Sequence, residues 1–240
     1  MRFIFLLLLL SFHVLSKSQG IYTQFGQNRV QFPETEYSLK QDNIEIIYYK
    51  DGEQLAKNVL SQASAILPIY ENKLNYNLSN GITIVVFNHV IDYLNSNLHL
   101  TNPQHYAGGY SSLNENTTSV YFNGNTAEFN KQIKKGIAEV MIYEFIFSGN
   151  IRERLHTAAL LSLPNWYFKG LTSYLAESWN IEKDNYLKDF FISGKAKNFT
   201  DLDEDDEILA GHSIWRFLEE KYGEGTVNNI VFLTRVGSSV

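Results

Sequence analysis

Apolar residues recur along the chain first at the spacing of strands and later at the spacing of helices. Two continuous runs rich in β-branched residues, 44–49 and 81–87, predict two buried strands. Between them, apolar residues at helical spacing predict an amphipathic helix over 53–74. Strand, helix and strand in this order describe a crossover unit that feeds one sheet.

The pattern changes after two shorter strand-like segments. Residues 107–110 and 118–122, which are separated by polar residues, predict a strand pair at or near a sheet edge. Helical spacing then dominates, and it predicts helices over 127–148, 154–162, 165–180, 184–194, 211–221 and 224–235. This order predicts an α+β fold: a small mixed β-sheet with a crossover helix, followed by a mostly helical half.

The first 18 residues have the layout of a secretory signal peptide. Arg2 provides the basic start, an apolar stretch runs from Phe3 to Leu15, and small serines precede a cut before Gln19. The apolar run is shorter than the about 20 residues that span a bilayer, and no later segment is long and apolar enough to do so. We therefore expect an exported mature chain without a transmembrane segment.

Composition narrows the class of protein further. The chain of 240 residues is 44% apolar and 14% aromatic, which predicts a folded core. It holds 20 basic and 26 acidic residues, and two of the basic ones lie in the leader, so the mature chain has a net charge of −8 and no basic stripe for nucleic acid. Cysteine is absent, which excludes disulfides, thiolate catalysis and Cys-zinc sites. An exported, disulfide-free chain rich in Asn and Lys is typical of a bacterial envelope rather than of a eukaryotic secretory route.

The mature chain divides into an arm and one domain. Residues 19–42 are polar with scattered aromatics, which predicts an extended arm. Its segment 21–32 could add to a sheet edge of this chain or of a partner. The remaining residues form one predicted domain, with a sheet half over 43–126 and a helical half over 127–240.

The helix predicted near the middle of the chain is apolar almost all the way round over 135–147. A helix of that kind lies inside a domain. It carries Glu139 and Glu144, and buried carboxylates need partners or a proton. Arg152 and Arg154 just downstream are candidate partners for an ion pair.

Two later segments add to this order of elements. Residues 163–174 have the sequence LPNWYFKGLTSY, and residues 211–223 have the sequence GHSIWRFLEEKYG. With the sheet and the central helix, they resemble in order and spacing the peptidase MA-like domain, a gluzincin-type zinc metallopeptidase fold, over residues 43–240. The resemblance implies a zincin-like fold with HExxH on the central helix and a third zinc ligand from a P-x-W-x-x-E-G segment on a later helix.

The zinc ligands implied by the resemblance are missing from this chain. The HExxH frame falls on residues 138–142, where only Glu139 is kept, and the third position is Lys169. Zinc needs two imidazoles at i and i+4, but Ala138 and Ile142 have no lone pair, and the ammonium of Lys169 would repel the metal. Without a metal, Glu139 has no acidified water to act on. We expect a pseudo-metallopeptidase without metal or cofactor, in which Ala138, Ile142 and Lys169 converge and Lys169 pairs with Glu139.

Other motifs give no enzyme class. The mature histidines have no metal-ligand spacing; they are His89, His99, His105, His156 and His212. The acidic run 201–207 lacks the glycine and the glutamate of a calcium loop at its sixth and twelfth positions, and it predicts a solvated acidic loop. The chain has no G-x-S-x-G elbow and no P-loop.

Three functional hypotheses remain. The first is a non-catalytic envelope interaction or scaffold module with an envelope or outer-membrane protein as partner. For this module the resemblance implies a TolB-like propeller downstream and a location in the periplasm or associated with the outer membrane, as in exported proteins of Gram-negative bacteria. The second is a residual hydrolase or peptidase that uses Glu139. The third is a carbohydrate- or peptidoglycan-binding module. For the first and third, aromatic side chains could line the vacant cleft, although ordinary core and rim packing is the competing interpretation. These aromatics are Tyr106, Tyr110, Tyr121, Trp166, Tyr167 and Trp179.

Overall fold

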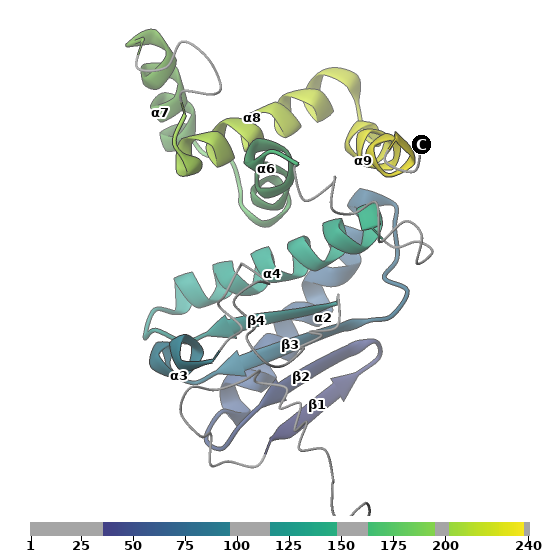
Figure 1. The fold of residues 1–240 in the computed structure, drawn as a ribbon, viewed down its shortest axis with the longest axis vertical. Coiled ribbons are helices and arrows are strands. Elements are labelled where there is room, and N and C mark those ends of the chain that lie inside the picture. The colour runs from purple at the N-terminus through teal and green to yellow at the C-terminus, as the bar shows by residue number, and fades with distance from the viewer. Residues whose placement is uncertain (1–35, 97–115, 148–162, 195–201, 238–240) are drawn as a thin grey trace, which may run out of the picture.

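The computed structural model describes residues 36–96, 116–147, 163–194 and 202–237. Within them it shows the predicted α+β fold, a small mixed sheet followed by helices (Figure 1). The predicted strand 107–110 and helix 154–162 lie outside the described residues, as do the predicted leader and the segment 21–32.

The sheet has four strands in the order β1-β2-β3-β4. β1 is antiparallel to β2, while β2, β3 and β4 are parallel to one another. The strands are β1 (Tyr37–Gln41), β2 (Ile44–Tyr48), β3 (Ile82–Phe87) and β4 (Thr117–Tyr121). β1 lies inside the predicted arm, so the end of that segment is an edge strand. The turn to β2 explains the difference, because Asp42 takes the left-handed conformation (φ 52°) that a tight hairpin turn requires.

The crossover helix α2 (Glu53–Leu74) has the predicted bounds. A short helix that the pattern did not predict, α3 (Val90–Asn95), follows β3. Its apolar side chains are not spaced toward one buried face, since none of its residues is buried.

The helical half follows the predicted order with shifted ends. Its described helices are α4 (Thr126–Phe147), α6 (Asn165–Ala176), α7 (Ile181–Ile192), α8 (Glu204–Tyr222) and α9 (Thr226–Gly237). The largest difference is the start of α8, because Glu204 to Glu207 form its first turn rather than an acidic loop. Asp203 caps this turn by accepting a hydrogen bond from the Asp206 N–H at 2.9 Å, and acidic side chains suit the positive end of a helix.

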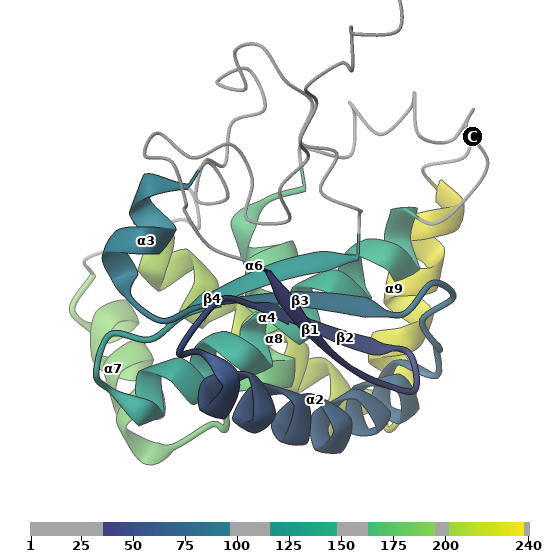
Figure 2. The same ribbon diagram turned by 90° about the horizontal axis from the view of Figure 1, so that it is seen from below.

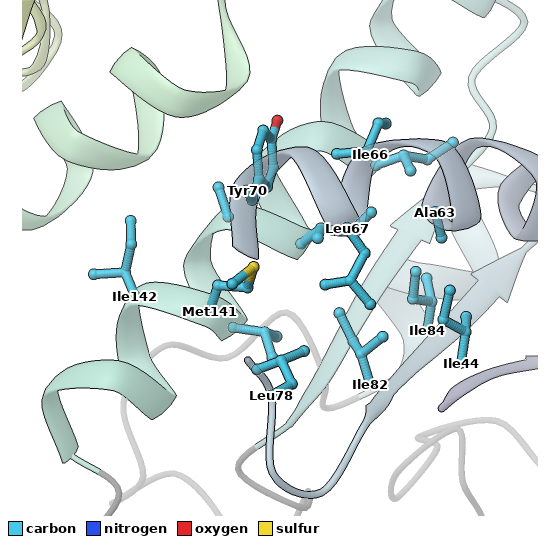
Figure 3. Packing of buried hydrophobic residues seen from close by; sticks show 14 of the residues in the cluster. Ile44, Ala63, Ile66, Leu67, Tyr70, Leu78, Ile82, Ile84, Met141 and Ile142 are labelled. Carbon is cyan, nitrogen blue, oxygen red and sulfur yellow. The ribbon is translucent and has the colours of Figure 1, made fainter. Parts of the chain in front are cut away.

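Helix α4 is the central layer of the described part (Figures 1 and 2). It lies on one face of the sheet beside α2, and α6 and α9 pack on its other side. The main core occupies these interfaces; Figure 3 shows Met141 of α4 among Leu67 and Leu78, while Ile142 projects from another side of the helix. The opposite face of the sheet carries a smaller buried group that includes Val85 and Phe87, with Tyr93 of α3 packed against it.

Two glycines allow α6 and α8 to pack with their backbones in contact. A Cβ on Gly211 would lie 2.1 Å from the Trp166 carbonyl oxygen, and one on Gly170 would lie 2.8 Å from the Gly211 Cα. No side chain fits between these helices at that point, so α6 and α8 form one tightly held unit. Among the described residues, no helix combines the length and the apolar character needed to cross a membrane.

Candidate functional site

The HExxH frame lies on the side of α4 that belongs to the main core. Ala138 and Ile142, the two positions that would carry imidazoles, are fully buried with 0% exposure. Glu139 between them is exposed. The helix therefore presents methyl and methylene groups where the resemblance would place metal ligands.

Glu139 is exposed and yet surrounded by much protein. Desolvation raises the pKa of this carboxyl, while the charges of Lys135 and Lys169 act against the rise. Among the described residues, no hydrogen bond or ion pair reaches the Glu139 carboxylate. In the described part of the chain, the carboxylate therefore interacts electrostatically with the ammonium groups of Lys135 on α4 and Lys169 on α6, but it contacts neither of them.

Lys169 on α6 forms its ion pair with Glu204 in the first turn of α8. It acts on Glu139 only through space. The expected contact between Lys169 and Glu139 is therefore replaced by a contact with α8, because the first turn of that helix begins seven residues earlier than predicted. The convergence of Lys169 on Ala138 and Ile142 stays a prediction.

A lysine-rich cluster beside this position was missed by the sequence analysis. Glu177, at the end of α6, accepts contacts from Lys131 at 3.2 Å, Lys135 at 2.8 Å and Lys183 at 2.9 Å. Burial alone would raise the pKa of Glu177, but the ammonium groups of Lys135 and Lys183 lower it to about 2. One carboxylate therefore ties α4, α6 and α7 together. The spacing of Lys131 and Lys135 on one helix face was a signal, but nothing local pointed to Glu177.

Glu144, just after the HExxH frame on α4, has a complete set of donors. Buried Glu144 accepts hydrogen bonds from the Tyr76 hydroxyl at 2.9 Å, the Ser79 N–H at 2.6 Å and the Asn116 side-chain amide. Arg152 and Arg154, which the sequence suggested as partners, lie outside the described residues. Neutral donors from the loop before β3 and the residue before β4 hold this carboxylate.

His212 is the buried histidine of the described residues. Its ring is 1% exposed on α8, its Nδ1 lies 3.0 Å from the Ser173 Oγ, and it packs between Tyr174 and Trp179. Burial lowers its pKa to about 4, with Lys183 acting in the same direction. A serine and a neutral histidine in contact suggest a nucleophile and a base, but both are sealed inside the packing of α6 on α8, where a substrate does not reach them.

The predicted cleft aromatics fall into separate groups. Tyr121 stacks on Tyr93 at 4.8 Å on the far face of the sheet, whereas Trp166 and buried Tyr167 pack together on α6. Trp179 packs on His212. Tyr106 and Tyr110 lie outside the described residues. The described aromatics therefore line no common surface.

Metal ligands do not gather in the described part of the chain. No group of three or more His, Asp or Glu side chains there could hold an ion. The Glu139 turn offers one carboxylate between two ammonium groups, a combination that disfavours a cation.

Comparisons of the chain with protein-family models, with curated proteins and with solved structures found no match. The resemblance to the peptidase MA-like domain therefore rests on the sequence segments alone. Function has to be argued from the site, because a fold by itself does not imply one.

Proposed function

We propose that the protein is an exported, non-catalytic interaction or scaffold module of a Gram-negative envelope, built on a gluzincin-like fold that has lost its zinc ligands. The leader-like residues 1–18 support export, and the segments 163–174 and 211–223 support the fold. An envelope or outer-membrane protein as partner and a TolB-like propeller downstream belong to the same proposal.

The burial of Ala138 and Ile142 carries the proposal. A zinc site needs ligand atoms that face open space for water and substrate. Here Ala138 and Ile142 are 0% exposed and belong to the core. The third position is Lys169, whose ammonium group is paired with Glu204. This part of α4 contributes packing where a peptidase would contribute chemistry.

Helix α7 is the surface on which the proposal places the partner. Among its twelve residues only Leu187 is buried. Ile181 and Ile192 are 78% and 74% exposed, and Tyr186 and Phe191 are about half exposed. Four exposed apolar side chains on a helix of twelve residues indicate a contact surface.

The charge around α7 indicates the chemistry of the partner. Asp206 in the first turn of α8 raises the pKa of the Tyr186 hydroxyl, and the charges of Asp203 and Asp205 act in the same direction. Exposed acidic side chains on α7 continue this surface; they are Glu182, Asp184 and Asp189. Apolar side chains with an acidic surround fit a partner segment that carries both basic and apolar residues.

A pair of synthetic peptides tests this surface. A helical Lys/Leu peptide is expected to bind the full chain, more weakly at high salt, while a matched Glu/Leu peptide does not bind. Tyr186→Ala with Phe191→Ala should weaken binding, and Ile69→Ala, at a 61% exposed position of α2, is the control. Equal binding of both peptides, or unchanged binding by the double variant, would overturn the assignment of α7.

Metal content tests the loss of catalysis. Purified full-length protein is expected to hold no stoichiometric zinc, and a chelator should leave its Tm unchanged, because a metal bound only to the native state would raise the midpoint. One tightly bound zinc per chain would refute the pseudoenzyme proposal.

The residual-hydrolase alternative rests on Glu139. A solvent-exposed carboxyl whose pKa is raised by desolvation has the properties of a general acid. If it acts in catalysis, a hydrolytic activity of the purified chain should disappear in Glu139→Gln, which preserves shape and removes the titrating proton. The glycan-binding alternative has no comparable support, since the described aromatics do not gather.

A further inference from the structure

The sequence contains two Asn-Gly pairs, and the fold treats them in opposite ways. One pair, Asn80-Gly81, precedes β3, and the other, Asn123-Gly124, lies between β4 and α4. An asparagine followed by glycine is chemically labile where the backbone is free, because glycine has no side chain to shield its own nitrogen.

The pair Asn123-Gly124 is open. Both residues are exposed, Gly124 has φ +91°, and an added Cβ would meet nothing within 4 Å. The Asn125 N–H donates a hydrogen bond of 2.9 Å to Asn123 Oδ1, which folds the side-chain amide forward over the following peptide. Among the described residues, no hydrogen bond holds the Gly124 N–H.

At Asn80-Gly81 the side chain of Asn80 is exposed, but the backbone on both sides of it is held. Gly81 is buried, and an added Cβ would lie 2.3 Å from the Asn43 carbonyl oxygen. The Gly81 carbonyl accepts a hydrogen bond of 2.9 Å from the Asn116 side chain, and the neighbouring Ile82 N–H donates to Asn43 at 2.8 Å. On the other side, the Ser79 N–H is held by Glu144.

We infer that Asn123 is a site of spontaneous deamidation and that the Glu144–Asn116 hydrogen bonds protect Asn80 from the same reaction. The Gly124 nitrogen attacks Asn123 Cγ, so a bond forms between these atoms while the Cγ–Nδ2 bond breaks. Nδ2 leaves as ammonia, taking the proton that the Gly124 nitrogen loses. Water then opens the cyclic imide at either carbonyl and yields aspartate or isoaspartate.

The Asn125 N–H contributes to this reaction as well as to the turn. It donates to the oxygen on which negative charge develops when Cγ is attacked, as an oxyanion donor does. The same residue caps α4, since its side chain accepts from the Ala127 and Glu128 N–H groups. The fold thus fixes the donor in place beside a glycine that has open space around its Cα.

The product would act on the start of α4. Aspartate at position 123 adds a negative charge near the positive end of the helix, where it is favourable. Isoaspartate instead adds a carbon to the main chain between β4 and α4, which shifts the Asn125 cap relative to Asn123. Ageing of the protein is therefore expected to yield two products, one with aspartate and one with isoaspartate at position 123.

Peptide mass mapping of the full chain tests the inference. After incubation of the folded protein at mildly alkaline pH, acid and iso-acid products at Asn123 should form at least about ten times faster than those at Asn80, which corresponds to about 1.4 kcal/mol between the two barriers. In urea, where both pairs are free, the two rates should become alike. Asn123→Gln keeps an amide but closes a less favourable ring, so its products should disappear at that position.

A second variant tests whether hydrogen bonds of the fold, and not the local sequence, slow the deamidation of Asn80. Asn116→Ala removes the hydrogen bonds to the Gly81 carbonyl and to Glu144, so Asn80 should deamidate faster while Asn123 keeps its rate. The inference is overturned if Asn80 reacts as fast as Asn123 in the folded wild-type chain, or if Asn123 stays intact until the chain is unfolded. This comparison in wild-type protein decides the matter even if the variant does not fold.

Discussion

Helix α4 carries two glutamates in adjacent turns, and the molecule gives them opposite surroundings. Glu144 is 4% exposed and its two oxygens are held by three neutral donors. Glu139 is exposed, has no described hydrogen-bond partner and responds only to lysines at a distance. Glu144 connects α4 to residues at the end of the sheet by hydrogen bonds. Glu139 occupies the glutamate position of the HExxH frame. The two glutamates therefore differ in burial and in hydrogen bonding because different segments of the chain pack against them.

The largest expected effect comes from installing ligands at the Glu139 turn. Ala138→His with Ile142→His and Lys169→Glu puts two polar rings into fully buried positions, which should cost about 5 kcal/mol of the free energy of unfolding without metal. If the frame is right, the three side chains meet and zinc should restore much of the Tm, although activity stays poor because no oxyanion donors have been added.

A variant of similar volume controls that experiment. Ala138→Phe with Ile142→Phe and Lys169→Glu adds rings without lone pairs, so its Tm, measured by thermal denaturation, should not respond to zinc. A folded histidine variant that also ignores zinc would show that the three positions never faced a common site.

The next largest effect is expected at the other glutamate. Glu144→Ala removes the acceptor of the Ser79 N–H and one of the two acceptors of the Asn116 amide, which should reduce the free energy of unfolding by about 3 kcal/mol. Tyr76→Phe removes one donor and keeps the ring that stacks on Phe145, so it should cost only about 1 kcal/mol. Urea denaturation of both variants measures the difference, and equal losses would contradict the role given to the Glu144 carboxylate.

The helical half should show a comparable dependence on pH. His212 has a folded pKa of about 4 against 6.5 in the unfolded chain, so the unfolded state takes up the proton first and stability falls as the pH drops from 6.5 to 4. The full loss is about 3 kcal/mol. Among the described residues, Lys183, Arg216 and Lys73 oppose the protonated ring, and Glu177 favours it.

Histidine variants isolate this effect in pH-dependent denaturation curves. His212→Phe should flatten the slope between pH 6.5 and 4, whereas His89→Asn, at an exposed position, should leave it unchanged. An unchanged slope in His212→Phe would mean that other groups cause the acid sensitivity.

Local patterns predicted much of this fold. The bounds of α2 followed from apolar residues repeating every three to four positions, and the runs of β2 and β3 from continuous β-branched residues. The start of α8 was missed because charge was taken as a sign of a loop. The better signal was Asp203, which lies three residues before Asp206. An N-cap side chain accepts a hydrogen bond from the N–H three residues later, so this spacing indicates the start of a helix.

The site could not be predicted in the same way, because its partners are distant in sequence. Glu144 is held by residues that precede it by 65 and 68 positions, and Glu177 by lysines on two other helices. Hydrogen-bond pairing across such separations depends on how the elements pack. The sequence identified Glu139 and Glu144 as needing an explanation, and only the packing distinguished them.

The smallest expected effect is the most informative about Glu139. Its folded pKa lies above its unfolded value, so the protonated carboxyl stabilises the fold below the unfolded pKa, and this contribution is lost as pH rises through the folded pKa. Glu139→Gln keeps the shape without the charge, so at neutral pH it should change stability by no more than about 0.5 kcal/mol, toward higher stability. The same substitution at Glu144 removes a charge that three donors hold, and it should lower stability under identical conditions. If Glu139→Gln instead destabilised the protein as much as Glu144→Gln, then the Glu139 carboxylate would be part of a structural network after all, and the contrast between the two turns of α4 would not hold.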